Sequence, residues 1–198
     1  MPRPPEDDPL TWFDDWMNQA RASSEPQPTA TSLATVDSSG QPTARIVLLK
    51  AFDRKGFTFY TNLNSAKARD LDHNRRAGLC FLWKSICRQV RIDGDVEPLD
   101  DAEADAYFAT RPRGSQIGAW ASKQSQRLAD RDTLVGRVEH FEKKFAGGDV
   151  PRPDFWGGFR IVPRRFEFWQ ERDHRLHDRW QFDRTGDDWQ WEARRLYP

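Results

Sequence analysis

Near the C-terminus, the segment Arg175-Leu-His-Asp-Arg179 carries two arginines and a histidine at alternate positions. In a β-strand, alternate side chains point to the same face, so Arg175, His177 and Arg179 would project together. Guanidinium groups fit phosphate or carboxylate, and an imidazole can transfer a proton near neutral pH. The pattern predicts either an anion site or an exposed sheet face neutralised by Asp or Glu on the next strand. Spacing alone favours the second interpretation.

A second cationic segment, Tyr60-Thr-Asn-Leu-Asn-Ser-Ala-Lys67, runs from a predicted strand into a predicted helix. The hydroxyls of Thr61 and Ser65, the charge of Lys67 and the free N–H groups of a helix start would together make a phosphate seat. An ordinary helix cap with a solvated lysine explains the same residues.

Three other segments add polar groups of the kind that hold anions or heterocycles. In Arg45-Ile-Val-Leu-Leu-Lys50, two cations flank an apolar strand and, by parity, point to opposite faces; they could also simply cap a wet strand end. Arg111-Pro-Arg-Gly-Ser115 follows Tyr107 closely and is expected to be a loop. Gln124-Ser125 offers an amide and a hydroxyl that could hydrogen-bond a heterocycle edge.

Composition and motifs exclude several classes of function. Lys plus Arg equals Asp plus Glu at 31 each, so the sequence lacks the basic excess typical of nucleic-acid binding. Mean hydropathy is −0.88 and the most hydrophobic run, Ile46–Leu49, is far too short to span a membrane, so we expect no membrane span, no secretory signal and a cytoplasmic location. Cys80 and Cys87 are expected to be reduced thiols. The four histidines lack metal-ligand spacing, so no metal site is predicted.

Periodicity predicts a mainly β chain with peripheral helices, which is an α+β arrangement built on a barrel. Residues 1–7 are expected to be disordered, and residues 8–198 to form a single domain. A helix is predicted from Pro9, capped by Asp8, and others over about 65–74, 100–110 and 132–146. Strands are predicted over 31–36, 44–52, 57–61, 78–83, 87–96, 158–162, 165–170, 175–182 and 189–196.

In order along the chain, these segments resemble the FMN-dependent pyridoxine/pyridoxamine 5′-phosphate oxidase family. The resemblance runs from about Ala30 to the C-terminus. The matching motifs are R-I-V-L-L-K (45–50), F-Y-T-N-L (59–63), R-Q-V-R-I-D-G (88–94), Y-F-A-T-R-P-R-G-S-Q-I-G-A-W (107–120), S-K-Q-S (122–125), F-W-G-G-F-R (155–160), F-E-F-W-Q (166–170) and R-L-H-D-R (175–179).

The resemblance implies a split β-barrel homodimer with FMN at the subunit interface. The residues implied to hold FMN are Arg45, Ile46, Val47, Leu48, Lys50, Tyr60, Thr61, Ser65, Lys67, Gln89, Gln124, Ser125, Trp169 and Arg179. The residues implied to hold the substrate are Lys50, Tyr107, Arg111 and Ser115 at its phosphate, and Arg175, Leu176 and His177 at its ring. Of these, Arg175 and His177 would lie near the reacting carbon and are the implied catalytic residues.

The implied reaction oxidises pyridoxine or pyridoxamine 5′-phosphate to pyridoxal 5′-phosphate. A hydride passes from substrate C4′ to the flavin, and oxygen then takes the electrons to give hydrogen peroxide. The alternatives are a flavin oxidase of the same fold acting on another flat heterocycle, such as a dihydrophenazine, and a non-catalytic flavin or pyridoxal-phosphate binding module.

Two departures from the family pattern are visible. The family's phosphate clamp usually reads Ser-Arg-Lys, whereas this chain has Ser65-Ala-Lys67. Loss of a charge-assisted hydrogen bond costs about 1.5–3 kcal/mol, which predicts weaker FMN binding unless another cation compensates. Many members also carry a longer N-terminal arm over the substrate, and only nine residues precede Leu10 here, so we expect no contacts from such an arm.

Overall fold

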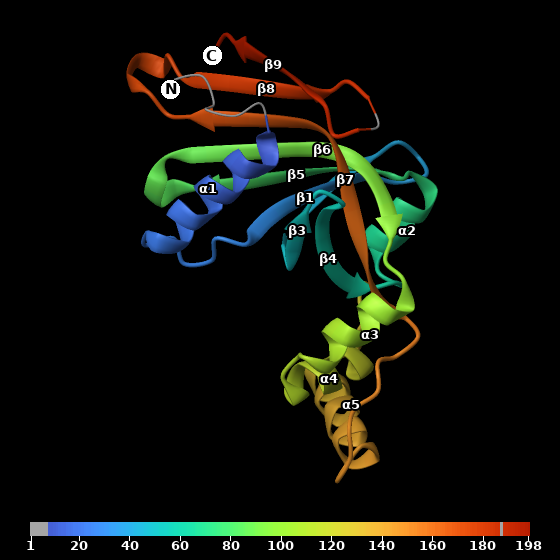
Figure 1. Cartoon of the computed structure of the whole chain (residues 1–198). Coiled ribbons are helices and arrows are strands. Elements are labelled where there is room, and N and C mark those ends of the chain that lie inside the picture. Colours follow the sequence, from blue (N-terminus) through green and yellow to red (C-terminus); the bar gives the residue numbers. More distant parts are fainter. Residues whose placement is uncertain (1–7, 187) are drawn as a thin grey trace.

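The computed structural model describes residues 8–186 and 188–198, so the segment 1–7 that was expected to be disordered lies outside the described residues. Helices lie mainly around one curled sheet (Figure 1). The elements occur in the order α1 (Pro9–Ala22), β1 (Ala30–Val36), β2 (Pro42–Leu48), β3 (Ala51–Asp53), β4 (Gly56–Asn62), α2 (Ala66–His73), β5 (Arg76–Trp83), η1 (Lys84–Ile86), β6 (Arg88–Pro98), α3 (Asp101–Ala109), α4 (Arg113–Ala121), α5 (Arg131–Lys144), β7 (Trp156–Gln170), η2 (Asp173–Arg175), β8 (Asp178–Arg184) and β9 (Trp191–Leu196).

The sheet is antiparallel throughout, and β7 connects its parts. Its strand order is β2-β1-β5-β6-β7-β4-β3, with β8 also paired to β7 and β9 paired to β8. The first residues of β7, 156–161, pair with β4, and its last residues, 165–170, pair with β8. One long strand thus belongs to the curled part of the sheet at one end and to the C-terminal hairpin at the other (Figure 1). This confirms the predicted split barrel with peripheral helices.

A bulge opposite Gly94, where Arg164 of β7 has no paired position on β6, lets β6 and β7 stay paired around the bend. The register between the two strands shifts between Asp93 and Gly94, opposite Pro163. A Cβ atom on Gly94 would overlap the carbonyl oxygen of Val162, so only glycine permits this close approach. The two strands predicted over 158–162 and 165–170 are therefore one strand, because the bulge absorbs the bend and accommodates the proline.

Two other predicted elements differ from the structure. The strand predicted over 44–52 stops at Leu48 and resumes as β3, so the parity rule that placed Arg45 and Lys50 on opposite faces does not apply. The break occurs because the two residues after β2 bond to different strands. The Leu49 N–H donates to the carbonyl oxygen of Thr29, before β1, and the Lys50 N–H donates to the carbonyl oxygen of Thr58, in β4. The loop predicted over 111–115 is also wrong, since α4 begins at Arg113.

The main core is aromatic and lies between α1 and the sheet. The Asp8 carboxylate accepts from the Leu10 N–H at 3.0 Å, which caps α1 as predicted. The ring of Phe13 is fully buried and contacts four other aromatic rings, those of Phe52, Phe57, Phe81 and Trp83. Trp12 stacks on Phe168 of β7 with ring centroids 4.3 Å apart. This helix therefore fixes the inner face of the sheet.

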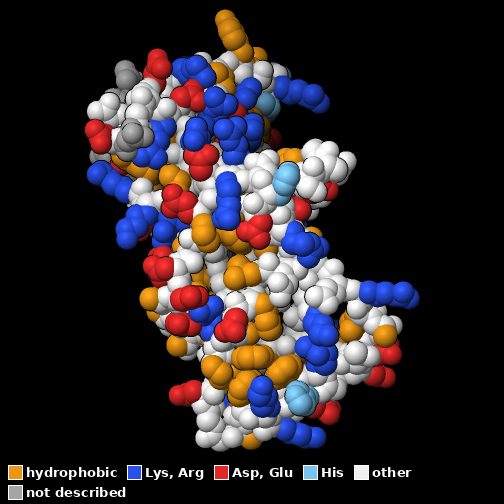
Figure 2. Space-filling model, turned by 90° about the vertical axis from the view of Figure 1, so that its right-hand side faces the viewer, with side chains coloured by type: hydrophobic (Ala, Val, Ile, Leu, Met, Phe, Trp, Pro, Cys, Tyr) orange, Lys and Arg blue, Asp and Glu red, His pale blue; other side chains and the backbone are white. Residues whose placement is uncertain are grey.

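Helices α3, α4 and α5 gather at one end of the barrel around a smaller core of Phe108, Ile117, Val150 and Trp156. Hydrophobic side chains also gather on the surface at this end, whereas Lys, Arg, Asp and Glu crowd the opposite end (Figure 2). Among the described helices, none has the length and apolar character needed to cross a membrane.

We predict that Phe13→Ala lowers the free energy of unfolding by about 3–5 kcal/mol, because it removes a fully buried ring from a packed aromatic cluster. Urea unfolding at a fixed protein concentration measures this change. Leu128→Ala, at a side chain that is 48% exposed, is the control and should change stability by less than about 0.5 kcal/mol. Equal effects of the two substitutions would contradict this account of the core.

Candidate active site

A cavity of about 660 Å³ lies where the barrel meets α3 and α4. This volume is within the usual range of small-molecule sites. The predicted site residues that line it are Ile46, Val47, Leu48, Lys50, Tyr60, Thr61, Lys67, Tyr107, Arg111, Ser115 and Gln124. They come from four separate segments of the sequence, and the fold brings them together around one space.

At one side of the cavity, Lys67 is held by neutral oxygens. Its Nζ donates to Thr61 Oγ1 at 3.1 Å, to Ser65 Oγ at 3.2 Å and to Gln124 Oε1 at 3.0 Å. Burial lowers the pKa of Lys67, the charge of Arg45 lowers it further, and the opposing effect of Asp70 is smaller. A partly buried ammonium among neutral acceptors is a site for an anion.

The start of α2 completes this seat. Ser65 is the N-cap and is fully buried, and its hydroxyl makes no capping hydrogen bond to the helix. The Ala66 N–H donates to Ser125 Oγ at 3.1 Å, which brings the second predicted hydroxyl to the helix start. Arg69, the next cation on α2, donates to the carbonyl oxygen of Asn64 instead. The positive end of the helix and Lys67 therefore act together.

Arg45 lies next to the cavity and has a carboxylate partner. Its guanidinium donates to Thr35 Oγ1 at 2.5 Å and forms an ion pair with Asp70 at 3.4 Å. Asp70 also accepts from the Thr35 hydroxyl at 2.6 Å. The Arg45 side chain is thus fixed on α2 directly behind Lys67, where its charge acts on the ammonium.

On the opposite side of the cavity, Arg111 lies over two aromatic rings. Its guanidinium carbon is 4.7 Å from the ring centroid of Trp156 and 5.3 Å from that of Phe108. Its Nη1 is buried without a hydrogen-bond partner, and burial lowers the pKa of the group. Buried polar atoms are almost always satisfied, so this nitrogen indicates a missing acceptor. The Ser115 hydroxyl also faces this space.

Parallel aromatic rings form the wall between these two cation seats. The Tyr60 ring stacks on Tyr107 with centroids 4.0 Å apart, and the Trp156 ring lies parallel to Tyr60 at 5.3 Å. Burial raises the pKa of Tyr60, and the charge of Glu103 raises it further, so the phenol stays neutral and able to donate. A flat heterocycle fits beside such a wall.

The sequence reasoning gave no role to several lining residues, which are Asn62, Thr110, Pro112, Gly118, Ala119, Ser122 and Trp156. For Trp156, the motif F-W-G-G-F-R marked the region, but only the fold shows that its ring supports Arg111. The Asn62 amide donates to the Ser122 carbonyl oxygen at 3.3 Å, which joins two walls of the cavity.

The segment that holds Arg175, His177 and Arg179 differs from the predicted strand. Arg175 belongs to η2 and has φ 62°, and β8 begins only at Asp178, so Arg175, His177 and Arg179 do not share one strand face. Arg179 forms an ion pair with Glu167 at 2.8 Å on the neighbouring strand. For this arginine the structure shows the neutralised sheet face that was the alternative interpretation. Leu176 is 68% exposed.

The remaining predicted residues nevertheless form a row on the sheet. Gln89, Trp169 and Arg179 occupy paired positions across β6, β7 and β8. The His177 ring lies 4.6 Å from the Trp169 ring. We call Gln89, Trp169, Arg175, Leu176, His177 and Arg179 the C-terminal cluster.

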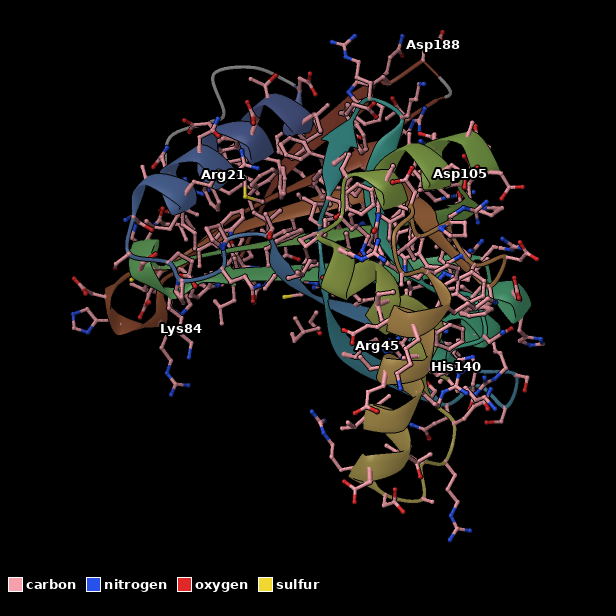
Figure 3. The ribbon with its side chains drawn as sticks, turned by 90° about the horizontal axis from the view of Figure 1, so that it is seen from below. Arg21, Arg45, Lys84, Asp105, His140 and Asp188 are labelled. Carbon is pink, nitrogen blue, oxygen red and sulfur yellow. The ribbon has the colours of Figure 1, made fainter. Side chains whose placement is uncertain are left out.

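The cavity and the C-terminal cluster are far apart within one chain. Trp156, the first residue of β7, lines the cavity, whereas Gln170 at its other end leads into η2. At about 3.3 Å per residue, these ends are roughly 45 Å apart along the strand. In Figure 3, Arg45 and Lys84 lie well apart, and the segment that follows β7 runs beside Lys84. The two groups therefore lie at opposite ends of β7.

Comparison with known proteins assigns the chain to a family. Residues 17–145 match the family described as "Pyridoxamine 5′-phosphate oxidase", and residues 156–198 match the "Pyridoxine 5′-phosphate oxidase C-terminal dimerisation region". The chain belongs to the pyridoxamine 5′-phosphate oxidase family. It therefore carries the family's dimerisation region, which includes β7, β8 and β9.

Relatives within the family are similar over nearly the full chain. A protein of Brucella anthropi named "Pyridoxine/pyridoxamine 5′-phosphate oxidase" is 52% identical over 190 residues, covering 96% of this chain and 94% of the relative. A protein of the same name from Azorhizobium caulinodans is 53% identical, covering 97% and 91%.

Solved structures of the family share the fold. PhzG from Burkholderia lata, solved with tetrahydrophenazine-1-carboxylic acid, has a TM-score of 0.90 at 30% identity and covers 98% of this chain and 94% of that chain. A pyridoxamine 5′-phosphate oxidase-related, FMN-binding protein from Nostoc punctiforme has a TM-score of 0.75 at 18% identity, covering 95% and 96%, and shows the fold alone.

We predict that Lys67→Met raises the melting temperature of the ligand-free protein at neutral pH by about 1–2 °C, since it removes a partly buried charge that water still screens. Because burial lowers the folded-state pKa of Lys67, the unfolded chain binds more protons between the two pKa values, and wild-type stability rises with pH there. The advantage of Lys67→Met should thus shrink as the pH approaches the ordinary lysine pKa of about 10.4.

Thermal unfolding across this pH range measures the effect. Lys55→Met, in the exposed turn between β3 and β4, is the control and should leave the melting temperature unchanged at every pH. If ligand-free Lys67→Met melts at a lower temperature than ligand-free wild type, the ammonium stabilises the fold, which would contradict this account of Lys67 as an anion-binding group.

Proposed function

We propose that this protein is an FMN-dependent oxidase that converts pyridoxine 5′-phosphate or pyridoxamine 5′-phosphate to pyridoxal 5′-phosphate. Oxygen is the electron acceptor and hydrogen peroxide is released. The observation that carries the proposal is the pair of cation seats, at Lys67 and at Arg111, on either side of a cavity with an aromatic wall. Two seats match two phosphate-bearing molecules, a cofactor and a substrate. The relatives' shared name supports this assignment.

The residues of the Lys67 seat fit the phosphate of FMN. An ammonium, the N-terminus of α2 and the hydroxyls of Thr61, Ser65 and Ser125 converge there. Bound FMN supplies the two-electron acceptor that the protein's side chains lack and returns the electrons to oxygen. The adjoining strand residues Ile46, Val47 and Leu48 supply the cavity wall beside it.

The Arg111 seat is suited to the phosphate of the substrate. Arg111, Ser115, Tyr107 and Lys50 line the same space and supply a guanidinium, two hydroxyls and an ammonium. The aromatic support under Arg111 orients its guanidinium and excludes water from one face. Binding the phosphate would fix the position of the substrate ring in the cavity, and such positioning alone favours the reaction.

The C-terminal cluster would reach the cavity from the partner subunit. The chain has the family's dimerisation region, and the cluster lies too far from its own cavity to contact the same ligand. In the homodimer, Gln89, Trp169 and Arg179 would contact FMN at the interface. Arg175 and His177 would lie at the substrate ring, where the imidazole can hold or move a proton.

The second candidate function is oxidation of a dihydrophenazine, favoured by the structural similarity to PhzG. The two separate cation seats argue against it, because a phenazine carboxylate brings one anionic group, whereas FMN and a phosphorylated substrate bring two phosphates. A non-catalytic binding module would hold FMN without turnover.

Oxygen uptake and peroxide release by flavin-loaded protein separate these functions. We expect turnover with pyridoxine or pyridoxamine 5′-phosphate and little with a dihydrophenazine carboxylate. Arg111→Gln should raise KM for the phosphorylated substrate about 10- to 100-fold, since it removes a charge-assisted contact worth roughly 1.5–3 kcal/mol. Its flavin content should match that of wild type. Flavin-loaded protein that releases no peroxide with either vitamer would refute the proposed function.

Mixed dimers test whether each site is shared between two chains. Arg111→Gln damages the cavity, and His177→Ala damages the C-terminal cluster. If one site uses both chains, unfolding and refolding the two impaired variants together should restore about one quarter of the wild-type rate at substrate concentrations well below KM, because half the dimers are mixed and each has one intact site. No recovery, with dimer formation confirmed by sedimentation, would place each complete site within a single chain.

A further inference from the structure

Arg152 lies in the segment that leads into β7 and joins three groups on two elements. Its side chain is only 10% exposed. The Nε atom donates to Asp105 Oδ1 at 2.5 Å, Nη2 donates to Asp101 Oδ1 at 2.7 Å, and Nη1 donates to the carbonyl oxygen of Trp156 at 2.7 Å. Both carboxylates belong to α3, and the carbonyl belongs to the first residue of β7. One guanidinium therefore links α3 to the start of β7.

Helix α3 has few other anchors. Of its nine residues, only Ala104 and Phe108 are buried. A second ion pair, between Arg160 on β7 and Glu103 on α3, joins their side chains at 2.6 Å. With so little apolar burial, polar ties to β7 determine where α3 lies.

These two linked elements carry the wall of the cavity. Tyr107 is on α3, two residues after Asp105, and Arg111 follows the end of the helix. Trp156 lies under the Arg111 guanidinium at 4.7 Å and runs parallel to the Tyr107 ring at 6.3 Å. The distance between α3 and the start of β7 thus sets the place of Arg111.

We propose that Arg152 is a positioning residue for the substrate phosphate. It does not line the cavity and touches no ligand, but it fixes Arg111 over Trp156. An exposed ion pair would contribute little, whereas this guanidinium is nearly buried and binds two carboxylates and a carbonyl in a fixed fork. Lysine donates from a single nitrogen and does not reproduce the planar fork, in which three different nitrogens each reach a separate acceptor. The inference rests on the proposed function and assigns a further residue to it.

Steady-state kinetics of Arg152→Gln test this role. We expect KM for pyridoxine 5′-phosphate to rise about tenfold and kcat to stay within about twofold, because phosphate binding contributes equally to the ground and transition states. Flavin content should not change. Arg152→Lys should recover only part of the loss. The matched control is Arg164→Gln, an exposed arginine paired with Asp95, which should leave KM unchanged.

A second variant removes the same ion pairs by changing the carboxylates instead of Arg152. Asp101 and Asp105 are 89% and 62% exposed, so the double variant Asp101→Asn with Asp105→Asn is expected to fold. It should raise KM in the same way as Arg152→Gln. An unchanged KM in this double variant and in Arg152→Gln would overturn the inference.

A double-mutant cycle separates positioning from a general loss of structure. If Arg152 acts through Arg111, Arg152→Gln should have little further effect on KM in the Arg111→Gln background. Effects that multiply would show that Arg152 acts by another route and would overturn the proposal.

Binding of pyridoxal 5′-phosphate, measured by equilibrium dialysis, distinguishes failure of this inference from failure of the proposed function. Weaker binding by Arg152→Gln, with unchanged binding by Arg164→Gln, supports the positioning role even in protein that shows no turnover. Wild-type protein without oxygen uptake would contradict the proposed function alone. Equal binding by wild type and Arg152→Gln would contradict the positioning role alone.

Discussion

Continuous pairing along β7 is the constraint on which the rest of the structure depends. This strand pairs with β4, β6 and β8, and the bulge at Gly94 keeps it paired through the bend. Its first residue, Trp156, supports the cavity wall, and its last leads into the C-terminal cluster. One strand therefore connects the cavity at its first residue with the C-terminal cluster beyond its last.

Charge around the cavity is arranged for ligands rather than for the free protein. Lys67 contacts only neutral oxygens through its ammonium hydrogen bonds, and Arg111 has a buried nitrogen without an acceptor. By contrast, Arg152 and Arg179 are paired with carboxylates. This contrast distinguishes cations that are free to bind an anion from cations that stabilise the fold.

Sequence patterns predicted the mainly β fold and the capped first helix, and they marked Thr61, Ser65 and Lys67 as neighbours, because each depends on local chemistry. Asp8 and Pro9 favour a helix start through contacts within a few residues of each other. Thr61, Ser65 and Lys67 are likewise close enough in the chain to be close in space.

The predictions that failed depend on distant contacts or unusual backbone angles. Alternation suggested a strand from Arg175, but its positive φ places it in a turn, which period-two counting cannot detect. The partner of Arg179 is Glu167, which only strand pairing reveals. Likewise, the role of Trp156 depends on Arg111, which lies 45 residues earlier in the chain.

The charge left in the Lys67 seat also bears on how much of this protein a cell retains. A chain that binds its cofactor only when folded is stabilised by that binding according to the free cofactor concentration. A chain without cofactor keeps the partly buried Lys67 ammonium without a bound anion, and it opens more readily to proteases. Flavin supply would then set the abundance of the enzyme as well as its activity, so that scarcity of one vitamin limits the production of another.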